Sequence, residues 1–274
     1  VTECKLSCAK DSVNVTCRHT NRKRGHAMKL SKQVFWGYLV FLSAAWWIAG
    51  RADWGSLDGI FAWRAVLSQY TGSIGIGVMS LAMLLTVRPT FLERRLGGLD
   101  KMYRLHKWLG ISALVMGILH WLGKQLPGWL VDLGWMERSV RVHMPEPADP
   151  FFKWLQSQRG VAEGMGEWAF YATVMLIVLA LVKWFPYRLF FKTHRLLAVA
   201  YLILVYHSVV LMKFSYWGEL LGTAMALLML GGSVAAFAIL FRRVGFGRRA
   251  VAIVQKVTYH AQVRVLEVTV QVKG

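Results

Sequence analysis

The sequence predicts an all-α membrane protein, a bundle of six transmembrane helices followed by a short C-terminal β segment. Three observations lead to this prediction. Of the 274 residues, 56% are hydrophobic and 17% charged, against about 45–50% and about 25% in soluble domains. Six apolar stretches reach the length of about 17–25 residues that a helix needs to cross the hydrocarbon. Basic residues gather in every second loop, as the positive-inside rule predicts for membrane proteins.

The six apolar stretches lie within residues 34–241, which we expect to form one transmembrane domain. A soluble amphipathic bundle would need polar residues at every third or fourth position, which these stretches do not provide. The expected spans are Val34–Gly50, Tyr70–Val87, Tyr103–Gly123, Trp168–Phe185, Thr193–Leu211 and Trp217–Phe241.

The distribution of basic residues predicts the orientation. Lys and Arg near helix ends stay on the cytoplasmic side, so both termini are expected to be cytoplasmic in a multi-pass protein of the plasma (inner) membrane. The net charge of +19 then reflects topology and contact with anionic lipid, and nucleic acid is not an expected partner. The basic clusters are Arg22, Lys23, Arg24, Lys29 and Lys32; Arg88, Arg94, Arg95, Lys101 and Arg104; Lys183, Arg188, Lys192 and Arg195; and Arg242, Arg243, Arg248 and Arg249.

Residues 1–33 are expected to be a basic N-terminal tail. Cys4, Cys8, Cys17 and His19 lie here, but their spacing matches none of the usual zinc-ligand patterns. From Met28 onward the sequence has a basic start followed by an apolar span. We therefore expect translation to begin at Met28, which would make the preceding residues non-native.

Four of the eight histidines lie in the third and fifth predicted helices. His106 and His120 are 14 residues apart, and His194 and His207 are 13 apart, which corresponds to rises of about 21 and 20 Å. Because the two helices run in the same direction, His106 shares a depth with His194, and His120 with His207. Two His pairs at two depths are what two stacked b-type haems require, with one axial imidazole on either side of each iron.

Nearby residues fit the haem interpretation, but the angular position of His207 on its helix does not follow simply from it. Gly110 and Gly117 would allow close approach of a porphyrin, although helix packing also explains them. At about 100° per residue, 13 steps leave His207 about 140° from His194. The fifth helix is therefore either wound differently between them or presents the haems on different flanks. Basic candidates for the haem propionates are Arg104, Lys107 and Arg195 beside the first pair and Lys124 beside the second, although topology explains these charges equally well.

Core histidines or a proton relay are the alternatives to haem. A relay would be expected to include Asp or Glu within the spans, and the third and fifth stretches contain neither. This favours haem.

In the last residues, 242–274, the hydrophobic pattern changes to a period of two residues. Val263, Val265, Val268, Val270 and Val272 fall near every second position, which is typical of a half-buried strand. We expect about two strands, which are too few to be stable alone in water.

Two segments, RPTFLERRLGGLDKMYRLHKWLGISALVMGILHWL and FPYRLFFKTHRLLAVAYLILVYH, resemble the ferric reductase and NADPH oxidase superfamily of transmembrane cytochromes b. The H-x13-H and H-x12-H spacings of Met102–Trp121 and Thr193–Ser208 reproduce its hallmark, and the resemblance extends from Val34 to the C-terminus. It implies two haem b groups, the inner one on His106 and His194 and the outer one on His120 and His207.

The resemblance also implies a cytoplasmic flavoprotein half, with FAD in a β-barrel and NADPH or NADH in a second lobe. Residues 242–274 look like the start of that barrel. Neither an H-P-F-[ST] motif nor a Gly-rich nucleotide loop appears in the sequence. We therefore expect the membrane half only, either truncated or supplied with electrons by a flavoprotein partner.

The implied function is that of a membrane oxidoreductase. Electrons would pass from a cytoplasmic flavin through the inner and outer haems to ferric iron or oxygen at the outer face. One alternative is a haem-containing relay subunit for a periplasmic partner protein, as in methionine sulfoxide repair systems; another is a haem-free channel or carrier. The β segment favours the oxidoreductase. Arg141, His143 and Met144 of the outer loop could contact the acceptor, although a lone loop histidine is more often solvated, and His260 is expected to be a surface strand residue.

Overall fold

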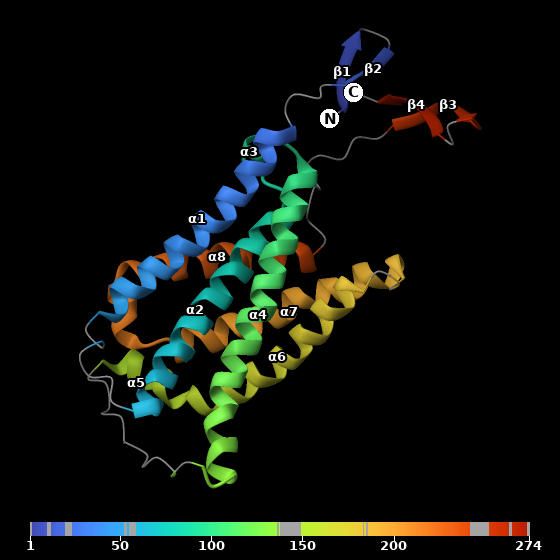
Figure 1. Ribbon diagram of the computed structural model, residues 1–274. Coiled ribbons are helices and arrows are strands. Elements are labelled where there is room, and N and C mark those ends of the chain that lie inside the picture. The colour runs from blue at the N-terminus through green and yellow to red at the C-terminus, as the bar shows by residue number, and fades with distance from the viewer. Residues whose placement is uncertain are drawn as a thin grey trace. The chain divides into compact units, whose positions relative to one another are not determined.

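The chain divides into two units (Figure 1). Residues Ser31–Val244 form the helical unit, while Val1–Leu30 and Gly245–Gly274 form the unit that contains the strands. The computed structural model describes residues 2–9, 12–19, 24–51, 54, 59–135, 137, 149–182, 184, 186–241, 252–262 and 265–272.

The helical unit confirms the predicted helical membrane bundle. Within the described residues, five helices are long and apolar enough to cross a membrane, and there are up to six spans if α2 and α3, bent by 101° at their break, count as one. The elements are α1 (Arg24–Gly50), α2 (Gly59–Thr86), α3 (Thr90–Leu96), α4 (Leu99–Asp132), α5 (Pro150–Ser157), α6 (Arg159–Leu181), α7 (Tyr187–Leu211), the short 3₁₀ helix η2 (Phe214–Gly218) and α8 (Leu220–Leu240).

Large apolar side chains cover the outside of the bundle. Trp47, Leu227 and Val234 are each at least 60% exposed, which in water would create an unusually large apolar patch. Contact with lipid tails removes this cost. The exposed surface therefore supports a multi-pass membrane protein.

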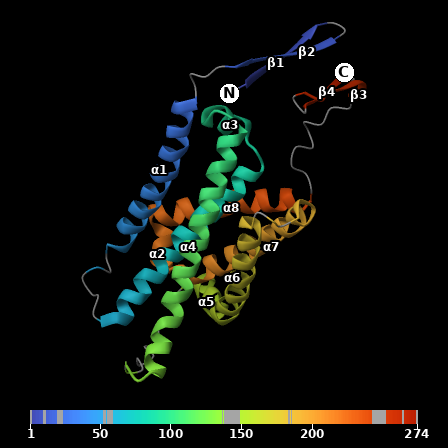
Figure 2. The same ribbon diagram turned by 45° about the vertical axis from the view of Figure 1, so that its right-hand side comes forward.

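Helix α2 lies at the centre of the bundle, where it packs against α4, α7 and α8 (Figure 2). Its buried Ser80 hydroxyl donates to the Ile76 carbonyl at 2.8 Å and meets the hydroxyl of Tyr201 on α7 at 2.9 Å. Gly232 on α8 leaves room for that tyrosine, since a Cβ there would collide with the Tyr201 hydroxyl. The Ser80–Tyr201 hydrogen bond satisfies both hydroxyls in the apolar interior. The absence of a side chain at Gly232 allows α8 to pack closely against α7 and α2.

Several helices extend beyond the predicted apolar stretches. Helix α4 runs from Leu99 to Asp132 and α2 begins at Gly59, because an apolar stretch identifies only the part of a helix that crosses hydrocarbon. The sharp turn from α2 into α3 passes through Arg88, whose φ is 56°, and then Pro89, whose ring ends the preceding helix. Helices α3 and α5 and the 3₁₀ helix η2 were not predicted, since each is too short for a span.

Residues 1–33, predicted as a basic N-terminal tail, include secondary structure that the sequence analysis did not predict. They contain an antiparallel hairpin of β1 (Thr2–Ala9) and β2 (Ser12–His19) and the start of α1 at Arg24.

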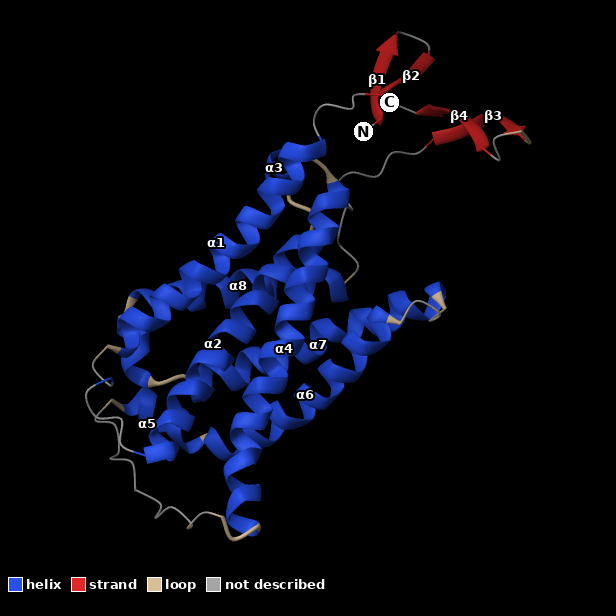
Figure 3. Ribbon diagram, viewed as in Figure 1, coloured by secondary structure: helices blue, strands red, loops and turns tan. Residues whose placement is uncertain are grey.

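The C-terminal strands are confirmed as a hairpin (Figure 3). Strand β3 (Ala252–His260) pairs antiparallel with β4 (Val265–Val272), with a register shift between Val254 and Lys256. The exposed His260 Nε2 lies 3.0 Å from Glu267 Oε2 across the pair, so His260 is a surface strand residue as predicted. Whether the hairpin belongs to a flavin-binding barrel stays a prediction.

Candidate functional site

The four histidines of the bundle face one another as two pairs. Helix α4 carries His106 and His120, and α7 carries His194 and His207. The ring centroids of His106 and His194 are 6.0 Å apart, and those of His120 and His207 are 6.3 Å apart. The structure therefore brings together the partners that the sequence spacing predicts.

The separation within each pair fits one metal ion between two imidazoles. A bond from an imidazole nitrogen to a first-row metal is about 2.0–2.1 Å long, and the nitrogen lies about 1.1 Å from the ring centre, so two rings on opposite sides of one ion have centroids about 6.2–6.4 Å apart. The observed 6.0 and 6.3 Å are close to this value. Direct edge-to-face ring contacts span about 4.5–7 Å, and the two pairs cross at 67° and 84°, so the separations are compatible with a metal ion without requiring one.

Backbone carbonyls fix the tautomer of three of the rings. The Nδ1 atom lies 3.0 Å from the Ala82 carbonyl oxygen in His106, 3.0 Å from that of Ser68 in His120 and 2.8 Å from that of Ala162 in His207. A carbonyl can only accept, so each Nδ1 carries the proton and donates it. Each Nε2 is then left with a free lone pair, which is the arrangement of a metal-bound histidine and its supporting hydrogen bond.

His194 is held differently. Among the residues that the structure describes, its buried Nδ1 has no hydrogen-bond partner, and its ring stacks on Phe190 at 4.9 Å and 16°. Helix α7 is one continuous α-helix from Tyr187 to Leu211, so of the two options for the 13-residue spacing, the structure favours different flanks over altered winding.

A cavity of about 480 Å³ lies beside His120 and His207, within the range of about 300–1,000 Å³ typical of cofactor sites. Helices α2, α4 and α6 supply its glycines. A Cβ at Gly166 would collide with the His207 ring, and one at Gly72 would lie 3.3 Å from His120 Cε1. A flat macrocycle can approach a helix where side chains are missing, so the site fits a haem. The lining glycines are Gly72, Gly75, Gly117, Gly160, Gly164 and Gly166.

The two glycines of α4 that were predicted to allow close approach of a porphyrin have different surroundings. No described atom lies within 4 Å of a Cβ built at Gly110, and Gly117 borders the cavity, where a Cβ would lie 3.4 Å from Phe170. Both positions are consistent with a bound macrocycle, and Gly117 also serves packing between α4 and α6.

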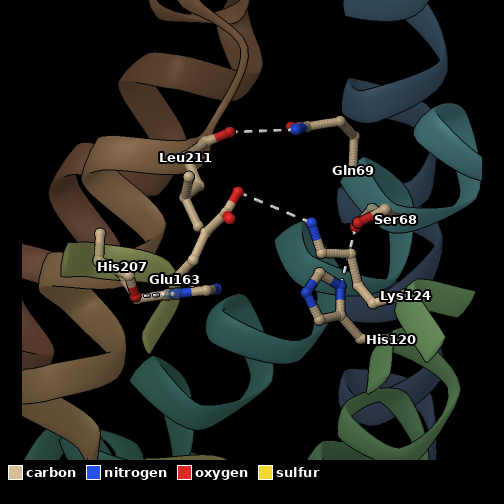
Figure 4. Close-up of polar contacts among 8 residues, drawn as sticks. Ser68, Gln69, His120, Lys124, Glu163, His207 and Leu211 are labelled. Atoms are coloured by element: carbon tan, nitrogen blue, oxygen red, sulfur yellow. Dashed lines mark hydrogen bonds and ion pairs between the residues drawn. The ribbon is translucent and has the colours of Figure 1, made fainter. Parts of the chain in front are cut away.

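Charged and polar side chains from α4 and α6 border the cavity (Figure 4). Lys124 Nζ lies 3.8 Å from Glu163 Oε1, and Gln125 Nε2 donates to Glu167 Oε1 at 3.4 Å. The structure thus places Lys124, a predicted propionate partner, beside the second histidine pair. Glu163 and Glu167 were not singled out in the sequence.

The propionate candidates beside the first histidine pair lie on the same two helices as its ligand candidates. Arg104 and Lys107 are exposed on α4 next to His106, and Arg195 is half-buried on α7 next to His194. Their proposed contact with a haem stays a prediction. Arg141, His143 and Met144 of the loop lie outside the described residues.

Sequence reasoning missed the contributions of α2 and α6. Their short glycine spacings, Gly72 with Gly75 and Gly160 with Gly164 and Gly166, were a usable signal for a helix face without side chains. The backbone carbonyls that orient the histidines have no sequence signal, because every residue has one.

Comparison with known proteins identifies a family for part of the chain. No curated protein matches the chain significantly. A family model described as "Ferric reductase like transmembrane component" matches residues 71–205, a range that contains His106, His120 and His194 and ends two residues before His207. This family typically binds haem b, and its membership implies transmembrane electron transfer. Residues 71–205 of this chain are therefore a ferric reductase-like transmembrane domain.

Proposed function

We propose that this protein is a membrane oxidoreductase that conducts electrons through two b-type haems, one held by His106 and His194 and the other by His120 and His207. The observation that carries the proposal is the pair of ring separations, 6.0 and 6.3 Å, between the same two helices. Packing alone does not require two histidine pairs with metal-sized gaps. An ionisable side chain in a membrane span is costly, so such residues usually have a function.

The protein's own groups prepare each site. When bound, haem accepts and passes on one electron at a time. The carbonyls of Ala82, Ser68 and Ala162 hold three imidazoles as the Nδ1–H tautomer, which keeps Nε2 available as ligand. Burial and ligand hydrogen bonds are main determinants of a haem potential, so these carbonyl bonds should also influence the potential of each site.

We infer the direction of transfer from the charge distribution. By the positive-inside rule, the basic clusters favour the cytoplasmic side for both termini and for the His106–His194 pair. A flavoprotein domain or partner that uses NAD(P)H and FAD would donate electrons there. Ferric iron or molecular oxygen would accept them on the other side, beside the His120–His207 pair. With two histidines holding each haem, the iron would have no free position for the acceptor, which would therefore be reduced at the haem edge.

The C-terminal hairpin favours this proposal over a relay subunit that serves a periplasmic protein. Strands β3 and β4 leave Ile253 and Val257 at least half exposed. A relay could end soon after its last helix, whereas an apolar strand pair is suited to continue into a larger sheet.

A visible absorption spectrum of the purified full chain tests the proposal. We expect a low-spin b-type spectrum, a sharp α-band after dithionite reduction and two haems per chain. Replacing any one of the four bundle histidines with alanine should remove one haem. The matched control is His260→Ala, which changes an exposed histidine on β3 and should retain both. A folded, colourless protein obtained with ample haem supply would refute the proposal.

A further inference from the structure

Gln69 on α2 joins two backbone groups where α7 ends. Its Nε2 donates to the Leu211 carbonyl at 3.1 Å, and its Oε1 accepts from the Lys213 backbone N–H at 3.3 Å (Figure 4 shows the first bond). Because a carbonyl only accepts and an N–H only donates, these partners also fix the orientation of the amide. The two bonds cross 142 and 144 positions of sequence.

The two backbone groups lie at helix ends. Leu211 is the last residue of α7, and Lys213 precedes η2. The last four carbonyls of a helix and the first N–H groups of the next lack intrahelical partners, and within a membrane protein such groups have to be satisfied internally. One glutamine side chain therefore satisfies both sides of the α7–η2 junction.

The adjacent residues of α2 hold the opposite histidine. The Ser68 carbonyl accepts from His120 Nδ1 at 3.0 Å, and the Thr71 hydroxyl lies 3.2 Å from the same atom. Thr71 Oγ1 donates to the Leu67 carbonyl at 2.8 Å, so it accepts from the histidine. Residues 68–71 thus fix the His120 ring directly.

The same segment reaches the helix that carries His207. His207 lies four residues, or one turn, before Leu211 on α7. Both histidines line one small cavity together with Ser68, Gln69 and Leu211. We propose that Gln69 is a positioning residue for this histidine pair. Through its bonds to the end of α7, it fixes where His207 stands relative to the His120 ring that Ser68 and Thr71 hold.

This inference rests on the proposed haem function but concerns one haem only. Nothing connects Gln69 to the Ala82 carbonyl or to His106 among the described contacts. Loss of the Gln69 bonds should therefore change the site of His120 and His207 and leave that of His106 and His194 as it was.

The test compares variants of the full chain for each haem separately. Gln69→Met conserves approximate volume and removes both hydrogen bonds. Gln69→Glu keeps an oxygen that faces the Lys213 N–H and should give an intermediate effect. The matched control is Tyr38→Phe, which removes a different bond onto α2, from the Tyr38 hydroxyl to the Gly77 carbonyl at 2.7 Å; this bond joins α1 to α2 and involves no group of α4 or α7.

The readouts are haem retention against an excess of a haem-accepting apoprotein, the low-spin ferric electron paramagnetic resonance signals and the two midpoint potentials. Loss of a group that supports a ligand typically weakens binding about 10–100-fold, so Gln69→Met should release one haem about tenfold faster or more. The signal and potential of that haem should shift, while those of the other stay at wild-type values. His120→Ala identifies which signal belongs to which pair.

The outcomes separate the two proposals. If the wild-type chain binds no haem, the proposed function fails. If it binds two haems and Gln69→Met matches Tyr38→Phe, or changes both haems equally, the positioning role is wrong and the proposed function stands. If Gln69→Met does not fold, Gln69→Glu decides by the same criteria.

Discussion

Gly166 offers the sharpest test of the site geometry. In the Gly166→Ala variant, the added Cβ would collide with the His207 ring, which at present donates from Nδ1 to the Ala162 carbonyl at 2.8 Å. The ring has to move, because the neighbouring atoms of α6 are backbone. The imidazole that we propose as a haem ligand would then lose its hydrogen bond and its alignment.

The size of the effect follows from two contributions. Loss of a typical hydrogen bond costs about 0.5–1.5 kcal/mol, and inserting a methyl group into a filled space costs about 1–3 kcal/mol. Together they amount to about 1.5–4.5 kcal/mol, and each 1.4 kcal/mol corresponds to tenfold in affinity. We expect about 10- to 1,000-fold weaker retention of the haem held by His120 and His207.

The assay follows the haem content and reduced α-band of purified variants during competition with an apoprotein. Gly37→Ala on α1 is the matched control. It makes the same change inside a helix, and no described atom lies within 4 Å of the new Cβ. Both variants gain about 1 kcal/mol in helix propensity, so this contribution cancels in the comparison. A Gly166→Ala protein with the spectrum and haem retention of Gly37→Ala would show that His207 does not lie against α6.

Three further predictions address the pairing, the donor and the core. His106→Ala and His194→Ala should remove the same haem, and His120→Ala and His207→Ala the other one, as followed by midpoint potentials; loss of one common haem in His106→Ala and His120→Ala would contradict the pairing. NADPH alone should not reduce the haems of the purified 274-residue chain, whereas dithionite or an added flavin reductase should, since the sequence contains neither of the expected nucleotide motifs; rapid reduction by NADPH without a flavoprotein would reveal a donor site that we missed. Gly232→Ala should lower thermal stability in detergent by about 1–3 kcal/mol, because the new Cβ would collide with the Tyr201 hydroxyl and overpack the core; an unchanged melting temperature would mean that α7 and α8 separate at little cost.

The sequence by itself determined the membrane class, the helical spans and the pairing of histidines. Apolar length reports directly on hydrocarbon thickness, so each predicted span lies mostly within a helix of the structure. The spacing of His106 with His120 and of His194 with His207 needed only the helical rise and a common direction to predict which rings meet. The alternating valines predicted the C-terminal hairpin for an equally local reason.

Only the tertiary structure decided how the rings are held. The carbonyls of Ser68, Ala82 and Ala162 belong to residues whose side chains give no sign of the role, and they reach the histidines across 24 to 52 positions of sequence. The bonds of Gln69 to the end of α7 depend in the same way on where α2 packs. Helical spacing fixes the depth of a residue, whereas the neighbour at that depth is set by packing between helices, which no single stretch of sequence contains.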